Sequence, residues 1–193
     1  MLQPPHYIKD DPLSAASYAR LASIMGHELA HAFQPGILPL AAGTGLHVVI
    51  DCLIEEFNGY CPLAGSNYSV QCVNGTRTAH ENWADFIGIR LAYSAYERRL
   101  AAAGLSISAY SNSSGGAGGL TYAQQFLIEL AGTWCGSFTG EEMNSVLLEH
   151  KHAPAKYRFI SMVKNFPEFD TAFIYGGGDN DGEGGERRCK MTL

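Results

Sequence analysis

Long apolar runs are absent from this chain of 193 residues. No stretch approaches the roughly 18 consecutive apolar residues that a membrane-spanning helix requires. The first residues also lack the positively charged segment followed by an apolar one that marks a secretion signal. The sequence predicts no membrane span, and we expect any anchor to lie outside this chain.

Other familiar patterns are missing as well. The sequence has no internal repeat, no glycine-rich phosphate-binding motif and no C-x-x-C pair of the kind that holds structural zinc. Its formal net charge is −6, which argues against a nucleic-acid partner and weakly favours neutral or cationic peptides. The length and the apolar share are those of one globular domain.

His27 and His31 are the two histidines of an H-E-x-x-H run, with Glu28 beside the first. In an α-helix, residues i and i+4 lie on one face, so both imidazoles can reach the same ion. The glutamate then points toward a water held by that ion, and zinc is the metal that this motif binds. The alternative is a pair of histidines that fall by chance at helical spacing around a solvent-facing glutamate.

A zinc hydrolase needs a third protein ligand and leaves one position for water. A third histidine in H-E-x-x-H-x-x-G-x-x-H is excluded, because Gln34 and Ile37 stand at the glycine and histidine positions. Glu81 on a later helix fits the other common arrangement. Asp85 follows four residues on, so one carboxylate can bind metal while the other meets a ligand imidazole. Alternatively, both acids serve only as partners of the helix dipole in the first turns of their helix.

A series of short blocks extends this pattern along nearly the whole chain. The blocks are Leu2-Gln3-Pro4-Pro5, Gly26-His27-Glu28, Glu81-Asn82, Ala84-Asp85, Trp134-Cys135-Gly136, His152-Ala153-Pro154 and Arg158. Together they resemble the C-terminal catalytic part of the neprilysin-like zinc metallopeptidases, the group that includes endothelin-converting enzymes. The resemblance implies a mainly α fold over residues 1–193, a thermolysin-like zinc-helix subdomain with long loops and little or no sheet.

The resemblance also implies zinc as cofactor, with His27, His31 and Glu81 as its ligands and Glu28 as general base. The chemistry of these residue types agrees. Zinc lowers the pKa of a bound water from about 15.7 to roughly 7. A neighbouring carboxylate can accept the proton as that water attacks a peptide carbonyl, and can later deliver it to the leaving amine.

Five further residues take roles by the same resemblance. Asp85 would orient a ligand histidine, His152 would stabilise the transition state, and Arg158 would meet a backbone carbonyl of the peptide substrate. Ile24 and Trp134 would form the pocket for a large apolar side chain after the cleaved bond. Taken alone, His152 reads as a surface histidine, whereas a charge such as Arg158 within an apolar helix normally has a partner or a function.

The chain departs from the family at three points. His150 replaces the aspartate expected two residues before His152, which leaves the orientation of that histidine open. Gln34 replaces an aspartate after Phe33, which removes one carboxylate near the site. Relatives carry a long upstream part with a strand that holds extended substrate, so we expect this chain to be a fragment or a minimal relative whose partner is that missing domain.

The chain has five cysteines, an odd number. The resemblance implies a disulfide between Cys52 and Cys189, while Cys61 and Cys72 flank a short loop and can close a local bridge. Cys135 is left over, because its family partner lies in the upstream part. The alternative, reduced thiols in the core, is typical of cytosolic proteins.

Three N-x-S/T sequons, at Asn67, Asn74 and Asn112, lie in turn-rich stretches where a glycan would be accessible. Together with the cysteines they favour an extracellular or secretory-pathway location.

Helices are expected over residues 13–34, 80–103, 120–135 and 153–165. Ser14 can cap the first, and Pro35 with Gly36 can end it. Thr139 and Glu142 offer a capping box for a further helix. The remaining stretches are expected to be loops: residues 37–79 around an apolar run, a glycine/serine link over 111–119 and a mobile glycine-acid loop over 176–185.

The sequence therefore predicts the catalytic portion of a zinc endopeptidase that hydrolyses small peptides before a bulky apolar residue. The alternative is a catalytically impaired extracellular binding or scaffold fragment that retains the peptidase fold. The presence of Glu28 beside a complete ligand set favours the enzyme.

Overall fold

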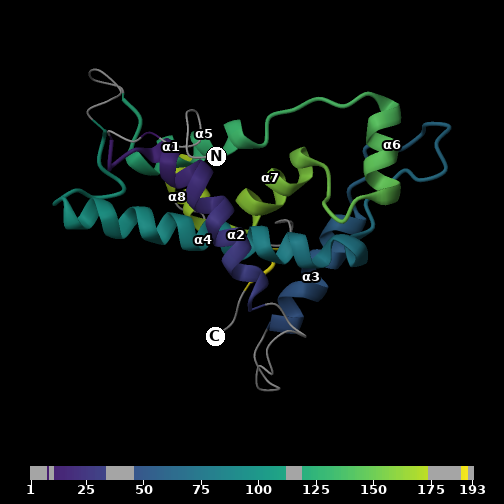
Figure 1. Cartoon of the computed structure of the whole chain (residues 1–193), viewed down its shortest axis with the longest axis horizontal. Coiled ribbons are helices and arrows are strands. Elements are labelled where there is room, and N and C mark those ends of the chain that lie inside the picture. The colour runs from purple at the N-terminus through teal and green to yellow at the C-terminus, as the bar shows by residue number, and fades with distance from the viewer. Residues whose placement is uncertain (1–7, 9–10, 34–45, 112–118, 174–187, 191–193) are drawn as a thin grey trace.

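The structure, a computed structural model, describes residues 8, 11–33, 46–111, 119–173 and 188–190. Helices dominate this part of the chain (Figure 1), and its one β pairing is an isolated bridge between Tyr110 and Thr121. The mainly α prediction with little or no sheet is confirmed. Within the same residues, no helix is both long enough and apolar enough to cross a membrane.

The longest element is α4, Gly75–Ala102, which runs across the molecule (Figure 1). Its N-cap is Asn74, whose side chain accepts a hydrogen bond from a backbone N–H of the first turn. The helix therefore begins five residues before the predicted start at residue 80. Glu81 and Asp85 consequently lie inside the helix, beyond its first turn, and the explanation of them as helix-dipole partners is wrong.

The first helical run is continuous but not uniform. It comprises α1, Ala15–Ser17, the π-helical segment η1, Tyr18–Ala22, and α2, Ser23–His31. Ser14 caps it as predicted, accepting from the amide of Ser17 at 3.2 Å. The run is shorter than residues 13–34 and ends at the second motif histidine. Pro35 and Gly36, expected to end it, lie outside the described residues.

Two glycines allow α2 and α4 to cross with their backbones in contact. A Cβ atom built on Gly26 would lie 2.8 Å from the carbonyl oxygen of Gly88. One built on Gly88 would lie 2.8 Å from the backbone nitrogen of His27 and 3.0 Å from the carbonyl oxygen of Ser23. Any larger residue at either position must force the helices apart.

The stretch over residues 37–79 was expected to be loop-rich, and this expectation is wrong for α3, Leu46–Asn58. Val49, Leu53 and Phe57 recur at four-residue spacing and are all buried, so they form one apolar face that packs with Trp83 and Phe86. The helical period is concealed in the sequence because neighbouring apolar residues fill the positions between them.

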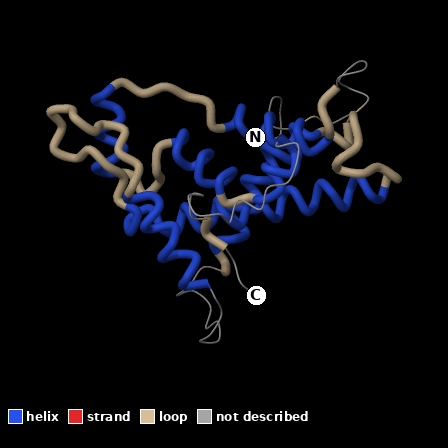
Figure 2. Tube along the Cα trace, turned by 180° about the vertical axis from the view of Figure 1, so that it is seen from behind, coloured by secondary structure: helices blue, strands red, loops and turns tan. Residues whose placement is uncertain are grey.

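The C-terminal half adds four shorter helices, which are seen from behind in Figure 2: α5, Tyr122–Thr133; α6, Gly140–Glu149; α7, Ala155–Lys164; and α8, Pro167–Phe173. The helices expected over residues 120–135 and 153–165 are thus present. The capping box of Thr139 and Glu142 starts α6 as predicted. The stretches over 112–118 and 174–187, which cover most of the expected link and glycine-acid loop, lie outside the described residues.

Two disulfides tie the elements together, and both are the predicted pairs. Cys52 of α3 is bonded to Cys189, and Cys61 to Cys72. Cys135 is exposed and carries no disulfide. The first bridge fixes the C-terminal segment against the core that α3 shares with α4.

Replacing Gly88 with alanine tests the helix crossing. Glycine to alanine inside a helix normally stabilises by up to about 1 kcal/mol. Here the new methyl group overlaps backbone atoms of α2, so we expect a loss of about 1–3 kcal/mol in the free energy of unfolding, measured by denaturant titration. Gly136→Ala is the control, because a Cβ there meets no atom within 4 Å. Stabilisation by Gly88→Ala would contradict the close crossing.

Candidate metal centre

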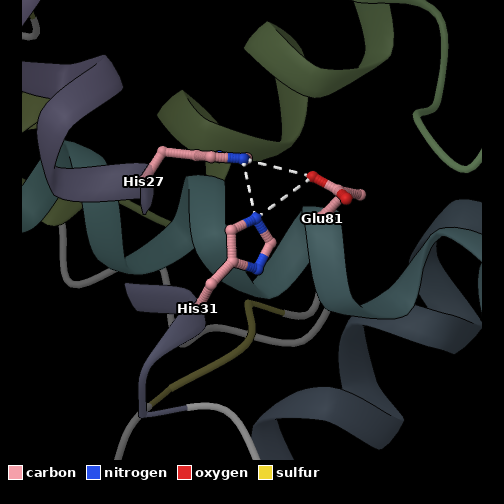
Figure 3. Close-up of side chains that lie close together, drawn as sticks. All are labelled: His27, His31 and Glu81. Carbon is pink, nitrogen blue, oxygen red and sulfur yellow. Dashed lines mark hydrogen bonds and ion pairs between the residues drawn. The ribbon is translucent and has the colours of Figure 1, made fainter. Parts of the chain in front are cut away.

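Three side chains from two helices converge on one point (Figure 3). The Nε2 atoms of His27 and His31 are 3.1 Å apart. Glu81 Oε2 lies 3.1 Å from the first of these nitrogens and 3.4 Å from the second. The convergence of His27 and His31 follows from their helical spacing, and Glu81 joins them because α4 crosses directly beneath α2.

These distances fit a tetrahedral metal. Ligand atoms about 2.0–2.2 Å from zinc in a tetrahedral arrangement stand about 3.3 Å from one another, close to the observed separations. The group also consists of two imidazoles and one carboxylate, a donor set suited to zinc. The lone pairs of the two imidazole nitrogens and of the carboxylate oxygen face one another at 3.1–3.4 Å. A cation between these atoms would remove the repulsion between their lone pairs.

Asp85 sets the orientation of His27. The Nδ1 atom of His27 donates to Asp85 Oδ1 at 2.8 Å. The lone pair of this ring is therefore on Nε2, the nitrogen that faces His31 and Glu81 in the three-residue cluster. Burial alone would lower the pKa of His27, but the hydrogen bond and the charge of Asp85 outweigh it and raise that pKa. The pocket thus favours a positive charge at this ring, whether supplied by a proton or by a metal.

Arg158 of α7 holds the opposite side of the same carboxylate. Its Nε and Nη2 donate to the two oxygens of Asp85 at 2.6 and 2.7 Å, a bidentate pair. Burial alone would raise the pKa of Asp85, but the charge of Arg158 and the hydrogen bond from His27 hold it below its usual value. The guanidinium also lies over the ring of Trp134, 4.2 Å from its centroid. The expectation that this buried charge has a partner is confirmed.

Two consecutive residues between α6 and α7 contact Glu81. His152 Nε2 lies 3.0 Å from Oε2, and Lys151 Nζ lies 2.8 Å from Oε1. Burial would raise the pKa of Glu81, but the hydrogen bond from Lys151 and the charge of His152 keep it lowered. The pKa of His152 is itself lowered, first by burial and then by the charge of Arg158.

A cavity of about 200 Å³ opens beside the cluster. Its lining includes all six side chains predicted to act in catalysis or substrate binding: Ile24, Glu28, Asp85, Trp134, His152 and Arg158. Ile89 and Met162 complete its apolar wall. The structure thus brings these residues together, while their individual roles stay predictions.

Neither residue that departs from the family pattern, His150 or Gln34, is one of the three metal-ligand candidates. His150 is exposed and forms the C-cap of α6, and Gln34 lies outside the described residues. Lys151 and Gly88 were not predicted from the sequence. The available signals were weak: a lysine adjacent to a predicted site histidine, and a glycine inside a helical pattern, which often marks a close contact.

The fold and the site together define a class: a mainly helical H-E-x-x-H protein whose third ligand candidate is a glutamate from a second helix.

Comparison with known proteins gives the family. The chain belongs to peptidase family M13, whose model matches residues 1–189, and the resemblance seen in the sequence is confirmed. It is 31% identical to membrane metallo-endopeptidase-like 1 of Mus musculus over 90% of this chain and 23% of that protein. It is 29% identical to endothelin-converting enzyme 1 of Homo sapiens, again over 90% of this chain and 22% of that protein.

The fold comparison agrees. The structure of the zinc metalloprotease Zmp1 of Mycobacterium tuberculosis in complex with an inhibitor matches with a TM-score of 0.71 and 26% sequence identity. The match covers 89% of this chain and 27% of that one. The chain therefore spans about a quarter of the length of these relatives.

The pair of Asp85 and Arg158 predicts a pH-dependent stability. Asp85→Asn leaves the largely buried guanidinium of Arg158, whose side chain is 12% exposed, without its counter-charge, and we expect it to cost about 3–5 kcal/mol at neutral pH in metal-free protein. Because the folded-state pKa of Asp85 is lowered, its contribution is full above the unfolded pKa of about 3.9 and is lost as the pH falls through the folded value. Denaturant unfolding at several pH values measures the difference.

Asp170→Asn supplies the control for this series. Asp170 pairs with Arg188 at 2.5 Å, with both side chains about one third exposed, so its replacement should change stability by less than about 1 kcal/mol. Equal effects of the two substitutions, or a gap for Asp85→Asn that widens in acid, would contradict the assignment.

Proposed function

We propose that this chain is the metal-binding catalytic portion of a zinc endopeptidase that hydrolyses small peptides on the amino side of bulky apolar residues. The observation that carries the proposal is the convergence of His27, His31 and Glu81 at separations that suit one tetrahedral ion. Membership of a peptidase family supports it, as does the adjoining cavity.

In this proposal the side chains around the cavity divide the work. A zinc ion would supply a water of lowered pKa and polarise the peptide carbonyl. Glu28, which lines the cavity together with His27, accepts the proton of the attacking water and passes it to the leaving amine. His152 lies at the cavity wall, where it can donate a hydrogen bond to the carbonyl oxygen as negative charge develops there.

The same cavity supports the proposed cleavage preference. Ile24, Trp134 and Met162 provide an apolar wall for a large side chain. Arg158 uses Nε and Nη2 on Asp85, which leaves Nη1 to donate to a backbone carbonyl of the substrate. A peptide bound in this way would present the bond before its bulky residue to the metal.

An extracellular or secretory-pathway location belongs to the proposal. The two disulfides support it, because such bonds persist in oxidising compartments. The sequon asparagines Asn67 and Asn74 are exposed, while Asn112 lies outside the described residues.

A further domain as partner is supported by the exposed surface of α2 and of the turn that follows it. Met25, Leu29 and Phe33 are each more than half exposed and follow at four-residue spacing, so they form an apolar stripe. The relatives, about four times as long as this chain, contain the additional residues that such a stripe could contact.

Glu28→Gln tests the general base. We expect the parent chain and the variant to bind equal amounts of zinc, about one ion per chain by metal analysis, because Glu28 is not a ligand candidate. Turnover of a quenched-fluorescence peptide should fall by about 10²–10⁴ in the variant. Equal hydrolysis by both proteins would refute the base assignment, and zinc without hydrolysis in the parent would favour the binding or scaffold fragment.

Trp134→Ala tests the apolar pocket. Loss of the indole removes most of one wall, so kcat/KM should fall about tenfold to hundredfold for a peptide with phenylalanine after the cleaved bond. For the matching peptide with alanine at that position, the change should be less than about threefold. Equal losses for the two peptides would mean that Trp134 does not contact that side chain.

A further inference from the structure

The two oxygens of the Glu81 carboxylate have different surroundings. Oε2 faces the cluster, with the Nε2 atoms of His27, His31 and His152 at 3.1, 3.4 and 3.0 Å. Oε1 lies 2.8 Å from Nζ of Lys151. The carboxylate is thus divided between a metal-directed oxygen and a lysine-directed one.

The lysine and the carboxylate differ strongly in exposure. The Glu81 side chain is 5% exposed, whereas that of Lys151 is 72% exposed. Lys151 therefore reaches from solvent over the rim of the site to a buried oxygen. Its neighbour His152 contacts the other oxygen, so two successive residues of the α6–α7 connection hold both oxygens of one carboxylate.

A carboxylate can bind a metal through one oxygen or through two. A second oxygen from Glu81 would occupy a further coordination position and would add negative charge at the ion. A catalytic zinc site instead has three protein ligands and an open position for water. Whatever keeps Oε1 away from the ion therefore decides whether the ion, together with its water, has four ligands or five.

We propose that Lys151 is a positioning residue that holds Glu81 Oε1 and so restricts Glu81 to one-oxygen coordination. This inference rests on the proposed zinc function of the same site. The ammonium satisfies the outer oxygen, and it withdraws part of the negative charge that Glu81 would otherwise give to the ion. It thereby keeps the ion four-coordinate, with its water as the fourth ligand, at the cost of weaker metal binding.

Lys151→Met keeps the aliphatic stem and removes the charge. We expect the cobalt(II)-loaded variant to show weaker visible absorption than the parent, because the ion gains a fifth ligand when Glu81 binds through both oxygens. Zinc affinity, measured by competition with a chromophoric chelator, should rise about fivefold, the upper range for losing a partly exposed ion pair.

Two control variants test whether the effect comes from losing the cation at position 151 rather than from the change in net charge. Lys151→Arg retains the cation and should keep the parent's cobalt spectrum and zinc affinity. Lys156→Met makes the same change in net charge at an exposed position of α7, and it should also match the parent. The cobalt spectrum and zinc affinity of both controls should differ from those of Lys151→Met only if the bond between Lys151 and Glu81 influences the ion.

The outcomes separate this inference from the proposed function. A parent chain that binds neither zinc nor cobalt would refute the zinc site itself. A parent that binds metal, with a Lys151→Met variant of unchanged spectrum or of weaker zinc affinity, would overturn the positioning role alone.

Discussion

The site depends on one backbone contact, the crossing of α2 over α4 at Gly26 and Gly88. The absence of side chains at these two positions lets His27 approach α4 closely enough to contact both Glu81 and Asp85. Glu81, Asp85 and Gly88 follow one another along α4 at intervals of four and three residues, so they lie on one face of the helix. The geometry of the metal candidate is thus set by a packing constraint before any ligand chemistry is considered.

The second organising element is the way positive charge surrounds two buried carboxylates. Asp85 is shared by the imidazole of His27 and the bidentate guanidinium of Arg158, and Glu81 by three imidazoles and the ammonium of Lys151. Each buried acid therefore has partners on both sides, which keeps it ionised in the protein interior. The arrangement links α2, α4 and α7 through one electrostatic network, so that the cavity and the cluster are positioned together.

The sequence predicted the parts of the site that follow from spacing or from residue chemistry. The four-residue interval fixed His27 and His31 on one face, and the same interval in α4 put a second acid behind the first. The capping box of Thr139 was readable because side-chain caps require particular residue types at particular positions.

The remaining features depend on contacts between distant segments, which spacing does not reveal. The helix α3 was missed because its buried stripe is embedded in a run of other apolar residues. The role of Gly88 requires knowledge of which helix crosses it, and that of Lys151 requires the path of the α6–α7 connection. The start of α4 was placed late because the capping residue Asn74 was read as a sequon in a turn.

In the proposed site, two imidazoles and one carboxylate oxygen hold a single zinc ion. X-ray absorption at the zinc edge of the metal-loaded chain measures this most directly. An ion held in this way should show about four nitrogen or oxygen ligands at about 2.0–2.1 Å, with the outer-sphere scattering of two imidazole rings. A sulfur ligand near 2.3 Å, or a spectrum without imidazole scattering, would contradict it.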